Sequence, residues 1–137
     1  MTKHKLQNVQ QPEVHLIAIS SHVNDYRLCW ALNNSLGIAM ARRRNDIVDH
    51  GDGRTVHFPV FDHFDEEAQA GITLVSNRAP GGMLVPQRQQ ADFFLVVDQE
   101  SPLGAAEVLD RVKRAEFVLT AFPLAVDAVK DGYKLLE

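Results

Sequence analysis

Polar side chains that could bind a ligand or carry out chemistry are few in this sequence, and the first of them is Asp92. It directly precedes a long apolar run, so its carboxylate enters a strand that we expect to be buried. A carboxylate in such a setting needs hydrogen-bond donors or a shifted pKa. Four other side chains are suitable partners by chemical type: Arg27, Asn33, Asn77 and Arg78. We therefore predict a ligand-binding set of Arg27, Asn33 and Asp92, beside the alternative that Asp92 only accepts hydrogen bonds from backbone amides of a turn.

Histidine and carboxylate side chains raise the question of a metal site, because they are the usual ligands of zinc and similar ions. Only His57, Asp62, His63 and Asp65 are close together in the sequence. His57 and His63 would lie about 20 Å apart on an extended strand, at roughly 3.3 Å per residue, so they could not chelate one ion. The prediction is that the chain has no metal site and no cofactor. The full set of histidines is His4, His15, His22, His50, His57 and His63.

The one basic cluster, residues 42–44, consists of three arginines and could hold a phosphate or an RNA backbone. In a strand the middle arginine would point away from its neighbours, so a solvated strand end is the better interpretation. The whole chain has 14 Lys and Arg against 18 Asp and Glu, a net charge of -4. General nucleic-acid binding through a basic surface is therefore disfavoured, although a local patch stays open.

A catalytic nucleophile is not apparent from the sequence. Cys29, the single cysteine, would need an activating base, and on the apolar side of a predicted helix it is better interpreted as a small core residue. The loop 79–82 is too short for a phosphate-binding glycine loop and matches no Walker or dinucleotide pattern. No Ser/His/Asp signature is present. We name no catalytic residue; whether the protein is an enzyme stays open, with a non-enzymatic role preferred.

An amphipathic helix is predicted from Val23 onward, because apolar residues recur there at three- and four-residue spacing. Ser21 or Asn24 can cap its start. Gly37 stands where a left-handed residue would end it. The alternative is a helix that continues to Arg44, because an interior glycine costs only about 1 kcal/mol.

Strands are predicted on both sides of this helix. The turn-rich segment 50–54 lies between two runs of β character and indicates a hairpin, and Pro59 argues that one edge of the second run is unpaired. Ser101 and Pro102 indicate the start of a second helix. Residues 124–137 stay open between a short helix and an irregular segment that leads to a terminal strand at 133–136. The predicted strands are 14–19, 38–48, 55–64, 72–77, 92–98 and 117–122, with a short extended piece at 83–86.

This order of elements predicts an α+β fold. We expect a two-layer sandwich, with a mainly antiparallel sheet of about six strands and two helices on one face. Residues 13–137 would form a single domain, preceded by a flexible tail at 1–12. The polar start and the lack of a long apolar run predict neither a signal peptide nor a membrane span, and a single cysteine suits a reducing compartment. We therefore expect a cytoplasmic protein.

The segment Val85-Pro86-Gln87-Arg88-Gln89-Gln90-Ala91-Asp92-Phe93 resembles the nine-residue signature of the IPExxxVDY family, small uncharacterised proteins mostly of Bacteroidetes. Residues 25–33 are similar to the first helix of that family, and the chain from about residue 13 fits its order of elements. Gln87 stands where the family has Glu, and Ala91 where it has Val. The first difference counts against a catalytic carboxylate at this motif. The resemblance implies the fold and a cytoplasmic bacterial origin, but no reaction.

Three classes of function follow from these observations. We prefer a non-enzymatic interaction domain that self-associates as a homodimer, because the strand around Phe58, Val60 and Phe61 is apolar on both sides and two helices would leave one sheet face partly uncovered. A small-molecule-binding regulatory domain is the second class, with an unknown ligand. An enzyme of unrecognised type is the third.

Overall fold

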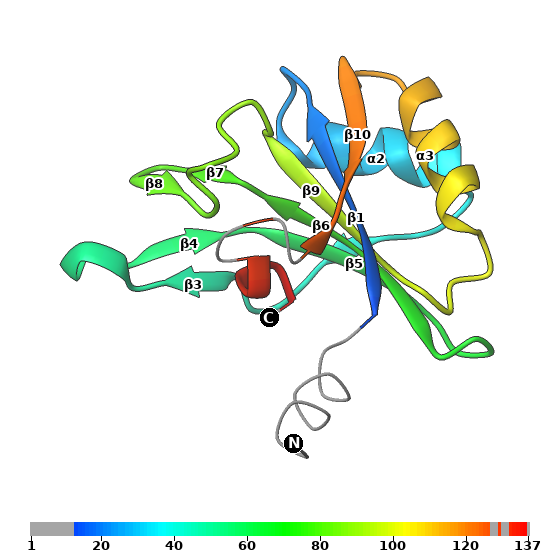
Figure 1. The fold of residues 1–137 in the computed structure, drawn as a ribbon, viewed down its shortest axis with the longest axis horizontal. Helices are drawn as coiled ribbons and strands as arrows, with labels where there is room; N and C mark the ends of the chain where they lie inside the picture. Colours follow the sequence, from blue (N-terminus) through cyan, green and yellow to red (C-terminus); the bar gives the residue numbers. More distant parts are fainter. Residues whose placement is uncertain (1–12, 127–128, 130–131, 137) are drawn as a thin grey trace.

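The computed structural model describes residues 13–126, 129 and 132–136, so the predicted flexible tail at 1–12 lies outside the described residues. A six-stranded sheet runs through the molecule in the order β10-β1-β9-β6-β5-β2, and every neighbouring pair is antiparallel (Figure 1). The predicted α+β class and its six-stranded antiparallel sheet are confirmed. The strands are β1 (Val14–Ser20), β2 (Ala41–Arg42), β5 (Val60–Asp65), β6 (Ala70–Ser76), β9 (Phe93–Asp98) and β10 (Thr120–Leu124).

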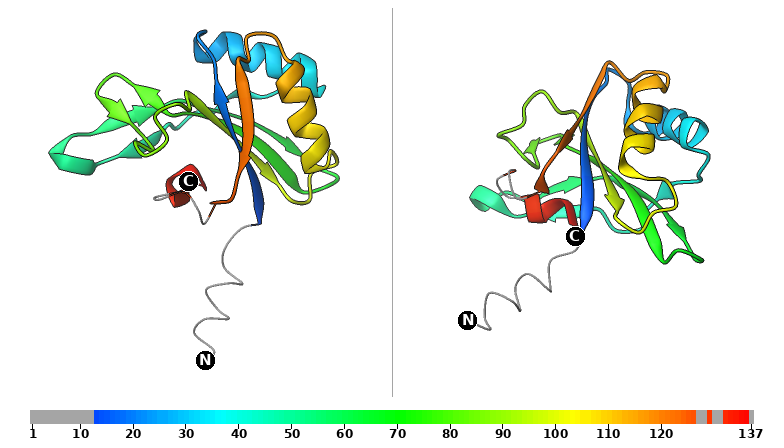
Figure 2. Two further views of the ribbon diagram at one scale, coloured as in Figure 1. Left: turned by 45° about the horizontal axis from the view of Figure 1, so that its top comes forward. Right: turned by 45° about the vertical axis from the view of Figure 1, so that its right-hand side comes forward.

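Both helices, α2 (Asp25–Leu36) and α3 (Ala105–Arg114), pack on the same face of the sheet, as predicted (Figure 2). Every second side chain of a strand packs against the two helices, because successive side chains of a strand point to opposite faces of the sheet. Burial of this apolar surface is the main stabilising contribution of the layer. Its core includes Ile17, Ile19, Leu28, Leu32, Leu74, Leu95, Val97, Val108 and Val112.

The opposite face of the sheet has a second buried core, so the expectation that it is partly uncovered is wrong. Two hairpins lie over it, β3 (Ile47–Asp49) with β4 (Val56–Phe58) and β7 (Arg78–Ala79) with β8 (Gly82–Met83), together with the loop 84–91 and the short helix η3 (Gly132–Leu136). The turn that joins β3 to β4 includes the short helix η1 (Gly51–Gly53). The core residues on this side include Leu16, Ala18, Phe58, Val75, Leu84, Val85, Phe94 and Leu135.

Pro59 explains how one chain segment contributes to two sheets, the small β3-β4 sheet and the main sheet. Pro59 separates β4 from β5, so the predicted strand 55–64 is divided between the small β3-β4 sheet and the main sheet. The preceding segment is divided in the same way, because β2 pairs with β5 while β3 pairs with β4. The predicted hairpin around 50–54 is therefore confirmed, with shorter strands.

Two predicted boundaries are wrong. Helix α3 begins at Ala105 after the cap residue Gly104, whereas Ser101 lies in a turn in which its amide donates to Asp98. The last strand is Thr120–Leu124 and not 117–122, so Pro123 lies inside it. It is an edge strand that pairs only with β1, and an edge tolerates a residue without an N–H. For 124–137, where the sequence left a short helix and a terminal strand open, the described residues 132–136 form the short helix η3 and no strand.

The ends of α2 follow local signals in the sequence. The Asn24 side chain caps the start by accepting the Arg27 amide at 3.0 Å. Gly37 ends the helix in the left-handed region, with a φ of 71°, and its amide donates to the Asn33 carbonyl at 2.8 Å. The shorter of the two helices considered from the sequence is confirmed.

Replacing Gly37 by alanine is expected to lower the free energy of unfolding by about 1 kcal/mol. No atom lies within 4 Å of a Cβ added there, so the cost comes from the positive φ alone. Gly82→Ala is the matched control, because its φ lies outside the left-handed region and its added Cβ makes only an ordinary contact with Val56 Cγ2 at 3.9 Å. Urea unfolding of both variants measures the difference, and equal losses would contradict the left-handed end as the cause.

No helix within the described ranges is long and apolar enough to cross a membrane.

Candidate functional site

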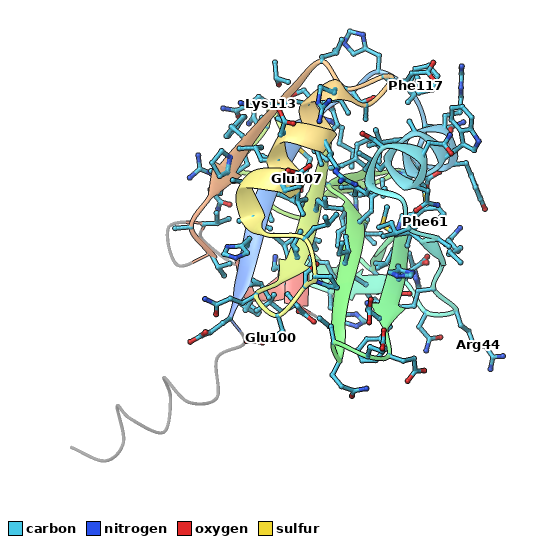
Figure 3. All side chains as sticks on the ribbon, turned by 90° about the vertical axis from the view of Figure 1, so that its right-hand side faces the viewer. Arg44, Phe61, Glu100, Glu107, Lys113 and Phe117 are labelled. Atoms are coloured by element: carbon cyan, nitrogen blue, oxygen red, sulfur yellow. The ribbon has the colours of Figure 1, made fainter. Side chains whose placement is uncertain are left out.

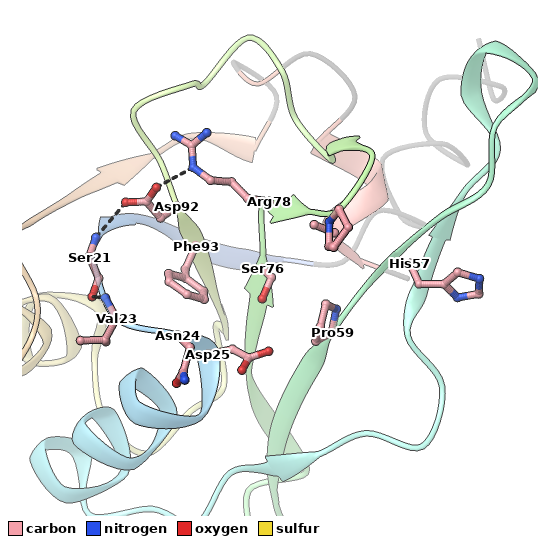
Figure 4. A pocket seen from close by; sticks show the side chains of 12 residues that line it. Ser21, Val23, Asn24, Asp25, His57, Pro59, Ser76, Arg78, Asp92 and Phe93 are labelled. Atoms are coloured by element: carbon pink, nitrogen blue, oxygen red, sulfur yellow. Dashed lines mark hydrogen bonds and ion pairs between the residues drawn. The ribbon is translucent and has the colours of Figure 1, made fainter.

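Asp92 is held by two partners at the entrance to β9 (Figure 4). Its Oδ2 accepts the Ser21 backbone amide at 2.9 Å, and its Oδ1 accepts the Arg78 Nε at 2.6 Å. Arg78 also donates to the Gln89 carbonyl. Asp92 thus accepts a backbone amide, but that amide belongs to Ser21 after β1 and not to the turn that enters β9, and its second partner is the guanidinium of Arg78. Its carboxylate connects the end of β1, the start of β7 and the start of β9.

Asn77 organises the loop 84–91. Its side chain has no exposed surface, and its Oδ1 accepts the Val85 amide at 2.7 Å. Its backbone amide donates to the Asp92 carbonyl at 2.9 Å. The role of this segment in the structure is to seal one sheet face. Asn77 Nδ2 donates to the carbonyls of Val85 at 3.4 Å, Arg88 at 3.2 Å and Ala91 at 2.9 Å.

The predicted set of Arg27, Asn33 and Asp92 is not brought together. Arg27 lies over the ring of Phe117, with its Cζ 4.6 Å from the ring centroid. Asn33 binds the backbone of Met40, whose amide donates to Oδ1 at 2.7 Å and whose carbonyl accepts from Nδ2 at 3.1 Å. Asp92 lines a separate pocket at the start of α2. The three side chains serve three different structural contacts.

Cys29 is a core residue with only 5% of its surface exposed, as the sequence suggested. Burial raises the pKa of its thiol from 9.0 to about 11, and the Asp25 carboxylate acts in the same direction. A nucleophilic cysteine needs the opposite change. The thiol of Cys29 is therefore protected from ionisation, which agrees with its interpretation as a core residue.

The free energy of unfolding is expected to depend on this thiol at alkaline pH. Above about pH 9 the unfolded thiol ionises while the folded thiol stays protonated, so its contribution is complete below pH 9 and is lost as the pH rises to about 11. The full loss is about 3 kcal/mol. Urea unfolding of the wild type and of Cys29→Ala across this interval isolates the thiol, because every other group is common to both proteins. A constant difference between them would contradict the prediction.

The basic cluster at 42–44 is largely engaged with carboxylates. Arg42 pairs with Asp46 at 2.8 Å, and Arg43 pairs with Asp62 at 2.9 Å. Across the described ranges, no three His, Cys, Asp or Glu side chains lie close enough together to hold a metal ion.

A pocket of about 360 Å³ lies where the first turn of α2 passes over the ends of β6 and β9 (Figure 4). Asp25 and Ser76 face it, and their sequence context gave no sign of this, because a serine at a strand end and an aspartate in a first helical turn are common features. Its lining residues also include Val23, Pro59, Phe93, Arg78 and Asp92.

The outer side of α2 carries two large exposed aromatic side chains. Tyr26 is 60% exposed and Trp30 is 55% exposed, and they are neighbours because they lie four residues apart on a helix. They border a shallow depression of about 350 Å³ together with Arg27, Glu116 and Phe117. Phe117 is labelled in Figure 3. We call these five residues the α2 aromatic surface.

Comparisons with protein-family models, with curated proteins and with solved structures found no match.

Proposed function

We propose that this chain is a non-enzymatic interaction domain that forms a homodimer through the α2 aromatic surface. The observation that carries the proposal is the pair Tyr26 and Trp30, each more than half exposed and adjacent on one helix. The α2 aromatic surface replaces the sheet face that the sequence favoured, because that face is covered within the chain.

The residue types of this surface support a protein interface. Trp, Tyr and Arg are the residues that most often dominate the binding energy of interfaces. Tyr26 packs edge to face on Phe61, with ring centroids 5.5 Å apart and an interplanar angle of 81°. Arg27 is similarly supported by Phe117. Because the side chains of Tyr26 and Arg27 are already held by these contacts, binding a partner would cost less conformational entropy than ordering two free side chains.

The charges favour a second copy of the chain as the partner. Arg27 and Glu116 border the same depression, yet neither makes an ion pair with any residue in the described part of the chain. In a two-fold dimer that brings Arg27 of one copy opposite Glu116 of the other, the symmetry makes the same pair a second time. The surface is then self-complementary in charge as well as apolar at its centre, which is what an isologous dimer requires.

The state of the polar groups supports a non-enzymatic role. The charge of Asp92 is balanced by its ion pair with Arg78. The raised pKa of Cys29 disfavours the thiolate, which is the nucleophilic form of its side chain. We extend the proposal to a bacterial, cytoplasmic protein of the IPExxxVDY family on the resemblance of residues 85–93.

Sedimentation velocity over a range from low to high micromolar concentration tests the proposal. We expect a monomer–dimer equilibrium, with quenching or a blue shift of the fluorescence of Trp30, the single tryptophan, as the dimer forms. A species that remains monomeric at high micromolar concentration, with unchanged fluorescence, would overturn it.

A further inference from the structure

The pocket beside α2 has features of a binding site that the dimer proposal does not use. Its lining shares no residue with the α2 aromatic surface. Its volume, about 360 Å³, is in the range of small-molecule sites. It exists because the chain turns at Pro59, between β4 of the small sheet and β5 of the main sheet, while α2 begins beside the end of β6 and the start of β9.

Ser76 is a buried polar side chain directed into this pocket. Its residue is only 6% exposed, and Figure 4 shows its hydroxyl pointing toward the space between Asp25 and Pro59. The hydroxyl makes no hydrogen bond with any described residue, and it is not sealed from solvent. A buried hydroxyl without a protein partner is costly unless water or a ligand binds it.

Asp25 supplies the unbalanced charge in the pocket. One of its carboxylate oxygens, Oδ1, accepts the Tyr26 amide at 2.7 Å, and Oδ2 has no partner among the described residues. The other carboxylate in the lining, Asp92, is matched by Arg78. The partial positive charge at the start of α2 equals only about half of one elementary charge, so the carboxylate of Asp25 exceeds it.

The remaining walls are apolar. The ring of Phe93 lies beside Ser76, and Val23 and Pro59 stand on either side of it (Figure 4). An aromatic face and a carboxylate within one small pocket both favour a cation, the ring through its quadrupole and the carboxylate through charge. His57 lines the rim, but its ring points away from the pocket.

We propose that this pocket binds a small primary amine with an apolar body, whose ammonium group donates to Asp25 and Ser76 while its body packs on Phe93, Val23 and Pro59. An anion is disfavoured because the one guanidinium in the lining, that of Arg78, is already bound to Asp92 and to the Gln89 carbonyl. The proposal adds a ligand site to the interaction domain and does not depend on its dimerisation.

Three probes of similar shape and different charge test the proposal: phenethylamine, 2-phenylethanol and 3-phenylpropionate. Isothermal titration calorimetry gives the affinities, and backbone amide chemical shifts locate the site. We expect phenethylamine to bind with a Kd on the order of 1 mM and to shift the amides of Asp25 and Ser76. The neutral and the anionic probe should bind at least about tenfold more weakly, because each lacks the charge-assisted hydrogen bond. Equal affinity for the three probes, or a preference for the carboxylate, would overturn the proposal.

Two substitutions identify the groups responsible. Asp25→Asn keeps an oxygen for the Tyr26 amide and removes the charge, so the preference for the amine should fall about tenfold or more. Ser76→Ala should weaken the binding of phenethylamine by a smaller factor. Asp110→Asn is the matched control, since Asp110 is an exposed carboxylate on α3 that is not part of the pocket. Circular dichroism confirms folding, and an Asp25→Asn protein that is folded but keeps the full preference would contradict the assignment.

Discussion

Replacing Asn77 by alanine is expected to lower the free energy of unfolding by about 3 kcal/mol or more. The substitution removes the acceptor of the Val85 amide and the donor to three carbonyls, all in a side chain with no exposed surface. Backbone groups of the loop 84–91 would then be buried without partners, and each such group costs about 1 to 3 kcal/mol. Leu84 and Val85 would lose the support that keeps them in the second core.

Urea unfolding measures this loss, and amide hydrogen exchange in residues 84–91 shows where it occurs. Asn34→Ala is the control, because Asn34 is exposed on α2 and alanine favours a helix. We expect the control to change stability by less than about 0.5 kcal/mol. A loss below about 1 kcal/mol for Asn77→Ala would mean that the loop is held by its apolar residues alone.

Replacing Trp30 by alanine is expected to weaken the proposed dimer by at least about a hundredfold in Kd. The effect is large because a two-fold interface contains the substituted residue twice, so the loss at one copy is doubled. Sedimentation velocity measures the change. Phe64→Ala is a close control, since Phe64 is an aromatic residue on β5 that is 53% exposed and lies outside the α2 aromatic surface. If the two variants weaken the dimer equally, the interface lies elsewhere.

Charge reversal then distinguishes self-association from binding to a different partner. Arg27→Glu and Glu116→Arg should each weaken the dimer, because each places like charges opposite one another. The double variant should recover most of the affinity, since the two-fold axis again brings opposite charges together. Recovery is expected only when the partner is a second copy of the same chain. No recovery in the double variant would reject the Arg27–Glu116 pairing.

The parts of the fold that follow local signals were predictable. Asn24 and Gly37 fix the ends of α2 through their own side-chain and backbone preferences, and these ends match the prediction. The apolar run at 93–97 was correctly interpreted as a central strand, because a strand covered on both faces has few polar residues. The carboxylate of Asp92 has the hydrogen-bond donors that a charge at the entrance of such a strand needs, and one of them is Arg78, a partner that the sequence analysis named.

The errors concern features decided by distant parts of the chain. Pro123 in the sequence indicates the end of a strand, yet it lies inside β10. The strand tolerates a proline because β10 is at the edge of the sheet. Ser101 and Pro102 are residue types that often start a helix. In this chain Ser101 instead belongs to the turn after Asp98, where its amide donates to the Asp98 carbonyl. The second core was missed because its cover comes from two hairpins and a loop that is held through Asn77. No local sequence pattern predicts that these segments fold back over the second face of the sheet.

The position of β1 has a consequence for how the protein folds during synthesis. The strand is made early, but its two partners come much later: Val14 pairs with Asp98, and Leu16 pairs with Leu124. The centre of the sheet therefore cannot close until the chain has left the ribosome as far as Asp98, and its edge beside β1 cannot close until Leu124 has emerged. For that interval an apolar strand is available to the wrong partners, which is the condition under which chains aggregate. Slow, post-translational folding that benefits from a chaperone is the expected behaviour of this topology.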